Sequence, residues 1–111
     1  MPESKETGAL TEAVYYILLS LYTPMHGYKI MQNVTAFSEG RVSLGPGTLY
    51  GALNTLLEKN WICMYENAEL QTTSRKKEYI ITDLGKSVLI GEVERLKELF
   101  ENGMKVMGGA S

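Results

Sequence analysis

A short basic run in the second half of the chain is the first group of residues that could do chemistry. Arg75, Lys76 and Lys77 are adjacent, and the hydroxyl-bearing segment 72–74 directly precedes them. Adjacent cations flanked by hydroxyls suit contact with a phosphate backbone or with the minor groove of DNA. A charge run of this kind can also be a solvated turn, because carboxylates lie near it in the sequence at Glu66, Glu69 and Glu78. Taken alone, the run leaves both interpretations open.

A second group of polar side chains lies between residues 48 and 58. Asn54 can form a bidentate pair with adenine in a major groove, and the hydroxyls of Thr48 and Tyr50 can donate hydrogen bonds to phosphate oxygens. Gly51 would let the backbone approach DNA closely. A solvated helix face is the simpler explanation of these residues alone. Their position shortly before the basic run favours a DNA-binding surface made of both groups.

Catalytic chemistry has little support in the sequence. The chain has one histidine, His26, and one cysteine, Cys63, and no glycine-rich loop that follows a predicted strand. These residues cannot supply a metal cluster, a disulfide framework or a nucleophile paired with a base. We therefore expect no enzyme activity, no cofactor and no bound metal.

Length and charge describe one small domain. The chain has 111 residues, of which 44% are hydrophobic, and this fits a single compact globular unit. Its net charge of −2 means that any DNA binding must depend on local basic groups. No apolar run approaches the roughly 20 residues that span a bilayer, and the polar first six residues are unlike a signal peptide. We expect a cytoplasmic protein without membrane contact.

Helical periodicity predicts three short helices that would position the polar groups. Apolar residues recur at helical spacing over residues 10–22, 27–37 and 46–60. Pro24 should end the first helix and Pro46 should open the third, because proline lacks the N–H that a helix interior requires. The polar residues would then lie on the outer side of the third helix, while its leucines turn inward.

After residue 60 the pattern becomes that of an antiparallel hairpin. Segments 61–65 and 77–81 have β-type composition, and the polar segment 67–74 between them is typical of a hairpin tip. Thr82 can cap a last helix over residues 83–107. The predicted fold class is mainly α with a small β-hairpin wing: a winged helix-turn-helix plus a long C-terminal dimerisation helix. Residues 1–83 would form the DNA-binding domain and residues 84–111 the dimerisation helix and tail, within a single compact unit.

Two apolar surfaces predict a homodimer. A heptad-like stripe follows the last helix at alternating steps of four and three residues, with Gly103 at one position and apolar side chains at the others: Leu89, Val93, Leu96, Phe100 and Met107. The first helix is apolar nearly all round, and such a helix should be buried on every side. A second subunit is the expected cover for both surfaces. The alternatives are a plain core helix for the first and docking onto its own domain for the last.

The same interface could hold a ligand. Tyr15, Leu19 and Tyr22 exceed the needs of one small core, and Phe100 and Met104 would supply adaptable walls opposite them. These five residues form the predicted pocket for a small aromatic or apolar effector. The simpler alternative is that they pack together and leave no cavity.

Several short motifs, taken together, resemble the PadR family of bacterial transcriptional regulators, in particular its short subfamily. The matching stretches are His-Gly-Tyr-Lys-Ile at 26–30, Pro-Gly-Thr-Leu-Tyr at 46–50, Ala-Leu at 52–53, Arg-Lys-Lys-Glu-Tyr at 75–79, Thr82 and Gly85. Together they cover about residues 10–100 in the order and spacing of that family. The resemblance implies a winged-helix dimer that usually represses transcription. It also implies DNA contact by the third helix and the wing, at Thr48, Tyr50, Arg75, Lys76 and Lys77.

The sequence thus predicts a sequence-specific DNA-binding regulator, a repressor, that binds a pseudo-palindromic operator in double-stranded DNA as a homodimer. A small aromatic or apolar effector would relieve repression. The alternative is a winged-helix module that binds proteins and not DNA. The basic run beside a small, polar helix face favours phosphate over protein as the partner.

Overall fold

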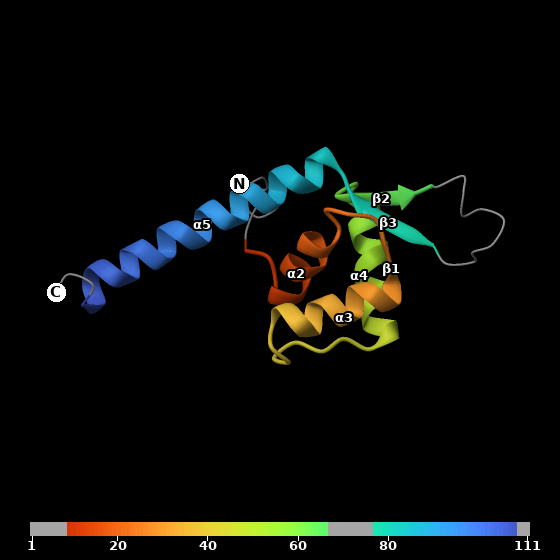
Figure 1. Cartoon of the computed structure of the whole chain (residues 1–111). Helices are drawn as coiled ribbons and strands as arrows, with labels where there is room; N and C mark the ends of the chain where they lie inside the picture. Colours follow the sequence, from red (N-terminus) through yellow and green to blue (C-terminus); the bar gives the residue numbers. More distant parts are fainter. Residues whose placement is uncertain (1–8, 67–76, 109–111) are drawn as a thin grey trace.

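The described part of the chain, residues 9–66 and 77–108 of the computed structural model, folds into four helices and three short strands (Figure 1). In chain order these are α2 (Glu12–Ser20), β1 (Met25–His26), α3 (Gly27–Phe37), α4 (Pro46–Glu58), β2 (Ile62–Tyr65), β3 (Glu78–Ile81) and α5 (Asp83–Met107). The predicted winged-helix class with a long last helix is confirmed. The second and last predicted helices agree with α3 and α5 at both ends.

Local side-chain chemistry decides where the helices begin. Thr11 Oγ1 accepts a first-turn N–H of α2 at 3.1 Å, and Thr82 Oγ1 accepts one of α5 at 3.0 Å. Such caps satisfy N–H groups that the first turn leaves without a helical partner. His26 does the same for α3, where its Nδ1 accepts an N–H at 3.4 Å. The lone histidine is therefore a helix cap.

Two helices end earlier than the periodicity predicts. α2 stops at Ser20 instead of residue 22, because the chain tightens there and the Leu21 N–H bonds to Leu18 O at 3.1 Å. α4 stops at Glu58 instead of residue 60, because Asn60 takes a positive φ of 64°. Asparagine tolerates that region better than most residues. The turn at Asn60 leads directly into the hairpin.

The hairpin belongs to a sheet of three strands, of which the sequence predicted only two. The strand order is β1–β3–β2, and both pairs are antiparallel. Met25 faces Tyr79 and His26 faces Glu78 across β1 and β3. The prediction missed β1 because a strand of two residues is too short to show alternation. β1 brings the start of α3 against the middle strand of the sheet.

The inner faces of the helices meet β3 in an apolar core. The core side chains with no exposed surface are Ile17, Leu18, Leu21, Ile30, Val34, Leu49 and Leu53. β3 adds Tyr79 and Ile81, and α5 adds Leu89. Burying one such aliphatic side chain contributes about 1.5–3 kcal/mol. This cluster fixes the inner face of α4, and the outer face of the helix remains exposed to solvent.

The long helix α5 leaves the core after its first half. Leu89 and Glu92 are buried, whereas every residue from Leu96 to Gly108 except Gly103 is exposed. Figure 1 shows this second half projecting from the domain on the side away from the hairpin. In the described part of the chain, no helix combines the length and apolar character of a membrane span.

A buried carboxylate ties α5 to the start of α2. Glu92 is 5% exposed and accepts hydrogen bonds from the Arg95 guanidinium at 2.8 and 2.7 Å. It also accepts the Leu10 N–H at 3.2 Å. The Arg95 hydrogen bonds, opposed by burial and assisted by the Leu10 N–H, lower the pKa of Glu92. The first half of α5 is therefore anchored by polar bonds as well as by apolar packing.

Replacing Glu92 by glutamine should destabilise the fold by about 1–3 kcal/mol near neutral pH, because hydrogen bonds to a charged group are the stronger ones. The pKa of Glu92 is lower in the folded than in the unfolded state. Its stabilisation is therefore complete above the unfolded pKa and is lost as the pH falls through the folded pKa. In denaturant unfolding, the gap between the parent and Glu92→Gln should close on acidification. The exposed Glu98→Gln on the same helix is the control, and an equal, pH-independent loss in both variants would contradict this role.

Candidate nucleic-acid interface

The outer face of α4 is a polar surface that faces solvent. Leu49, Leu53 and Leu56 are buried on the inner side of the helix. The residues predicted to face outward are all exposed, namely Thr48, Gly51, Asn54, Thr55 and Glu58. Gly45 precedes the helix without a side-chain cap, so no side chain covers the first turn of α4 from that position. The side chains on this face are small or polar and suit close approach to a groove.

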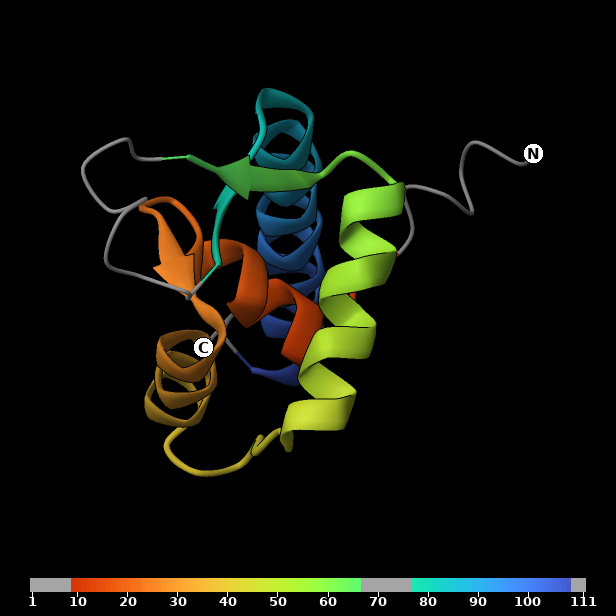
Figure 2. The same ribbon diagram turned by 90° about the vertical axis from the view of Figure 1, so that its right-hand side faces the viewer.

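Four of the residues predicted to contact DNA lie in the described part of the chain. Thr48, Tyr50 and Asn54 are on α4, and Lys77 directly precedes β3; all four are exposed. Arg75 and Lys76, with the predicted hairpin tip, lie outside the described residues. Figure 2 looks at the end of the molecule opposite the C-terminal half of α5 and shows α4 beside the hairpin strands, with α5 behind. α4 and the base of the wing are therefore presented together at that end.

Tyr50 differs from the other members of this group because its ring packs against α3. A Cβ built on Gly27 would stand 2.2 Å from the Tyr50 Oη and 2.7 Å from its Cζ, so the end of the ring touches the glycine backbone. Burial first, and then the neighbouring Tyr50, raise the pKa of Tyr79 on β3. The ring thus lies between α4 and the start of α3, near the middle strand. Tyr50 is nevertheless 43% exposed, so part of its side chain faces solvent.

The other end of α4 is fixed by hydrogen bonds from the start of α5. Thr82 Oγ1 donates to Asn60 O at 2.7 Å, and the Thr82 N–H donates to Trp61 O at 2.9 Å. A Cβ on Gly85 would stand 2.1 Å from Trp61 O, so a larger residue would push the two backbones apart. These four residues, Asn60, Trp61, Thr82 and Gly85, form the α4–α5 junction.

The residues predicted to form a dimer interface divide into two groups. Leu89 is 2% exposed and packs in the core of its own chain. The other four are exposed: Val93 at 45%, Leu96 at 40%, Phe100 at 67% and Met107 at 81%. We call these four residues the exposed α5 stripe. Contiguous apolar surface of this kind marks a contact region more often than a surface that stays in water.

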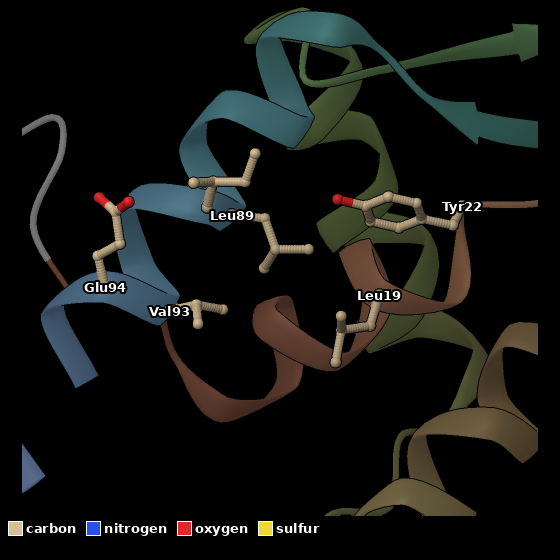
Figure 3. Close-up of a pocket in the computed structure, with 6 residues that line it drawn as sticks. Leu19, Tyr22, Leu89, Val93 and Glu94 are labelled. Carbon is tan, nitrogen blue, oxygen red and sulfur yellow. The ribbon is translucent and has the colours of Figure 1, made fainter. Parts of the chain in front are cut away.

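A groove lies between α2 and the first half of α5. Its volume is about 320 Å³, and it is lined by Leu19, Tyr22, Leu89, Ile90, Val93 and Glu94. Figure 3 shows Leu19 of α2 and Tyr22, which follows that helix, facing Leu89 and Val93 of α5 across the groove. At the edge of the groove, the Lys86 Nζ lies 5.3 Å from the centroid of the Tyr22 ring. The groove is thus apolar in its walls and charged at its margins.

The groove contains part of the predicted effector pocket. Leu19 and Tyr22, two of the five residues named for that pocket, line it. Tyr15 does not line it and instead packs edge-on against Tyr16, with ring centroids 5.6 Å apart. Phe100 and Met104 lie farther along α5 than any lining residue. Within one chain the structure therefore brings Leu19 and Tyr22 to the groove, but not Tyr15 or the two residues farther along α5.

Three residues that position this surface were missed by the sequence analysis. Gly27 and Gly85 entered it only as letters of the family motifs, although a glycine in the first turn of a predicted helix can signal a close approach. Glu92 was not singled out, because an acidic residue beside the apolar stripe of a helix is ordinarily exposed to solvent. Gly27 and Gly85 contact residues that are distant in the sequence, and Glu92 binds the distant Leu10 as well as the nearby Arg95, so no local pattern identifies the full set of contacts.

Comparison with known proteins gives one family. A family model described as "Transcriptional regulator PadR-like family" matches residues 16–90. The matched stretch runs from α2 into the first half of α5 and includes α4 and the hairpin strands. No curated protein matches the sequence.

Solved structures of similar fold cover most of the chain. A PadR-like transcription factor from Bacteroides fragilis is 26% identical, with a TM-score of 0.65 over 95% of this chain and 96% of that one. A PadR family transcription regulator from Clostridium difficile is 24% identical, with a TM-score of 0.67 over 86% of this chain and 98% of that one. A transcriptional regulator from Clostridium thermocellum is also 24% identical, with a TM-score of 0.64, over 86% and 94%. At 24% identity the two clostridial structures support the fold alone.

Proposed function

The chain belongs to the PadR-like family of transcriptional regulators, and from this premise we propose that it binds a specific operator as a homodimer and represses transcription there. The observation that carries the proposal is the outer face of α4. It is polar, exposed and beside the hairpin, while the inner face of the same helix is locked in the core. A major groove about 12 Å wide accepts one helix presented in this way.

The proposed contacts follow from the chemistry of the exposed groups. Asn54 pairs with a base, and the hydroxyls of Thr48 and Tyr50 contact phosphates. Lys77, with Arg75 and Lys76, contacts the phosphate backbone or the minor groove from the wing. Phosphate contacts position the protein on the duplex, and the base contact selects the sequence.

The proposed dimer forms through the exposed α5 stripe. Its apolar side chains continue the face by which Leu89 enters the core, so one helix face would serve both the fold and the assembly. A second copy of α5 offers the same stripe, which is the self-complementary surface that a twofold interface requires. Two α4 helices related in this way would read the half-sites of a pseudo-palindrome about one helical turn, or a multiple, apart. Occupancy of such a site near a promoter would exclude polymerase and repress transcription.

Asn54→Ala should lose about 1–3 kcal/mol of affinity for operator DNA, because a bidentate base contact is removed, and little on random duplex. The operator is obtained by selecting bound fragments from a random duplex library. Asn102→Ala, at an exposed asparagine on the projecting half of α5, is the matched control.

Replacing Arg75, Lys76 and Lys77 by alanine should instead weaken binding to operator and to random duplex alike. It should also lower the slope of the salt dependence by about one per lost phosphate contact. If selection enriches no sequence, the chain is a protein-interaction module instead.

Phe100→Glu should convert the dimer into a monomer, because it places a charge in the centre of the exposed α5 stripe. Asn102→Glu adds the same charge outside the stripe and should leave the dimer intact. Light scattering coupled to size-exclusion chromatography measures both masses. A dimeric Phe100→Glu variant would remove the second half of α5 from the interface.

We further propose that a small aromatic or apolar molecule binds at the groove between α2 and α5 and weakens operator binding. The groove walls are apolar, and in the proposed dimer they adjoin the interface that sets the spacing of the two α4 helices. Phe100 and Met104 would then reach the pocket from the partner subunit. A ligand acts in this way only if it binds the two spacings with different affinity. A coupling of about 1–3 kcal/mol would change operator affinity some 5–150-fold.

Titration of a panel of flat aromatic compounds, with and without operator, tests the effector. Binding should weaken operator affinity and should itself weaken in Tyr22→Ala, because Tyr22 forms one wall of the groove. Tyr28→Ala, at an exposed tyrosine of α3 outside the lining, is the control for ligand binding. A ligand that binds but leaves operator affinity unchanged, or a panel without any binder, would contradict the effector role.

A further inference from the structure

Gly27 is a buried glycine whose backbone does not need a glycine. It is the first residue of α3, and its φ is not positive, unlike those of Gly40 and Gly108. Glycine is a poorer helix former than alanine. The reason for it here is space, because a Cβ would stand 2.2 Å from the Tyr50 Oη, 2.7 Å from Cζ and 3.2 Å from Cε1. Because Gly27 has no side chain, the end of the Tyr50 ring can occupy the space beside its backbone. We call this contact of the Tyr50 ring with the Gly27 backbone the seat of Tyr50.

The ring in this seat joins α4 to the start of α3, and it lies near the middle strand of the sheet. Tyr50 belongs to the first half of α4 and follows Leu49, which is fully buried. Gly27 begins α3, directly after the strand β1. Tyr79, whose pKa the neighbouring Tyr50 helps to raise, is on the middle strand of the sheet and faces Met25 of β1. A shift of the ring would therefore change how α4 lies against α3, close to the strand that leads to the wing.

The two ends of α4 are held by different means. At the C-terminal end, the α4–α5 junction supplies hydrogen bonds of 2.7 and 2.9 Å from Thr82. At the N-terminal end, Gly45 provides no side-chain cap. Leu49 packs there, but apolar packing is not directional. The seat of Tyr50 on Gly27 is a contact with a defined direction in the half of α4 that carries Thr48.

We propose that Tyr50 is a positioning residue: its ring, seated on Gly27, fixes the orientation of the N-terminal half of α4 and so decides whether Thr48 and Asn54 reach the groove in register. This inference rests on the proposed DNA-binding function. It assigns the ring a role separate from the phosphate contact of the hydroxyl. It also gives Gly27, which is buried and touches no DNA in this scheme, an effect on sequence discrimination.

Four variants distinguish the effect of the Tyr50 ring from that of its hydroxyl, and the effect of the Gly27 contact from a general loss of folding. Tyr50→Phe keeps the ring and removes the hydroxyl, and Tyr50→Leu empties the seat. Gly27→Ala displaces the ring but leaves its chemistry intact, and because the contact is with the far end of a flexible side chain the domain can keep its fold. The double variant Gly27→Ala/Tyr50→Leu has no ring left to displace. Gly91→Ala is the control, since a Cβ at that helical glycine meets nothing within 4 Å.

The readout is the ratio of the dissociation constants for random duplex and selected operator at one salt concentration. Gly27→Ala and Tyr50→Leu should lower this ratio about tenfold, as misplacement of a base-reading group would, while random-duplex affinity stays within about twofold. Tyr50→Phe should keep the parental ratio, even if loss of the hydroxyl weakens binding to the operator and to random duplex equally. The double variant should be no worse than Tyr50→Leu, because the two changes act through one contact. Far-ultraviolet circular dichroism and the melting temperature confirm that each variant is folded.

Two results would overturn the proposal. A folded Gly27→Ala variant with the parental ratio would show that the seat does not position α4. A Tyr50→Phe variant as poor as Tyr50→Leu would show that the hydroxyl, and not the ring, carries the effect. A parent that does not distinguish operator from random duplex would instead overturn the proposed function itself, so the two failures are distinguishable.

Discussion

The α4–α5 junction is the constraint on which the rest of the protein depends. The Thr82 hydroxyl accepts the Gly85 N–H and donates to Asn60 O, while the Thr82 N–H donates to Trp61 O. Gly85 approaches Trp61 O so closely that no side chain fits between them. The end of α4, the start of β2 and the start of α5 therefore share one set of bonds. A rotation of α5 must carry α4 with it or break these bonds, so in the proposed dimer the pairing of α5 sets the separation of the two α4 helices.

The helices were predictable because burial of one face requires apolar residues at a fixed spacing. The bounds of α3 and α5 and the inward leucines of α4 follow from that rule. The same rule could not separate the two uses of α5, because docking on its own domain and pairing with a second helix need identical spacing. In the structure Leu89 follows the first use, while the exposed α5 stripe remains open for the second.

Contacts between distant residues could not be predicted from the pattern. The strand β1 exists because Met25 and His26 meet Tyr79 and Glu78, more than fifty residues later in the chain. Glu92 accepts the Leu10 N–H across 82 positions, and Gly27 contacts Tyr50 across a shorter separation. Each of these contacts lies within one chain and positions α4 or α5, and none of them is a proposed contact with DNA. The outer face of α4 was predictable as a surface, but the contacts that orient it were not.

The orientation of α4 matters for the proposed DNA binding because the chain carries a net negative charge. With a net charge of −2, the protein cannot rely on long-range attraction to phosphate, which supplies most non-specific affinity. In the proposed complex, discrimination between DNA sequences therefore depends on correctly placed contacts from α4 and the wing. Hydroxyl-radical footprinting of the full chain on its selected duplex tests this claim most directly. We predict two protected patches related by twofold symmetry, with centres about one helical turn or a multiple apart; a single patch, or uniform weak protection without sequence preference, would contradict it.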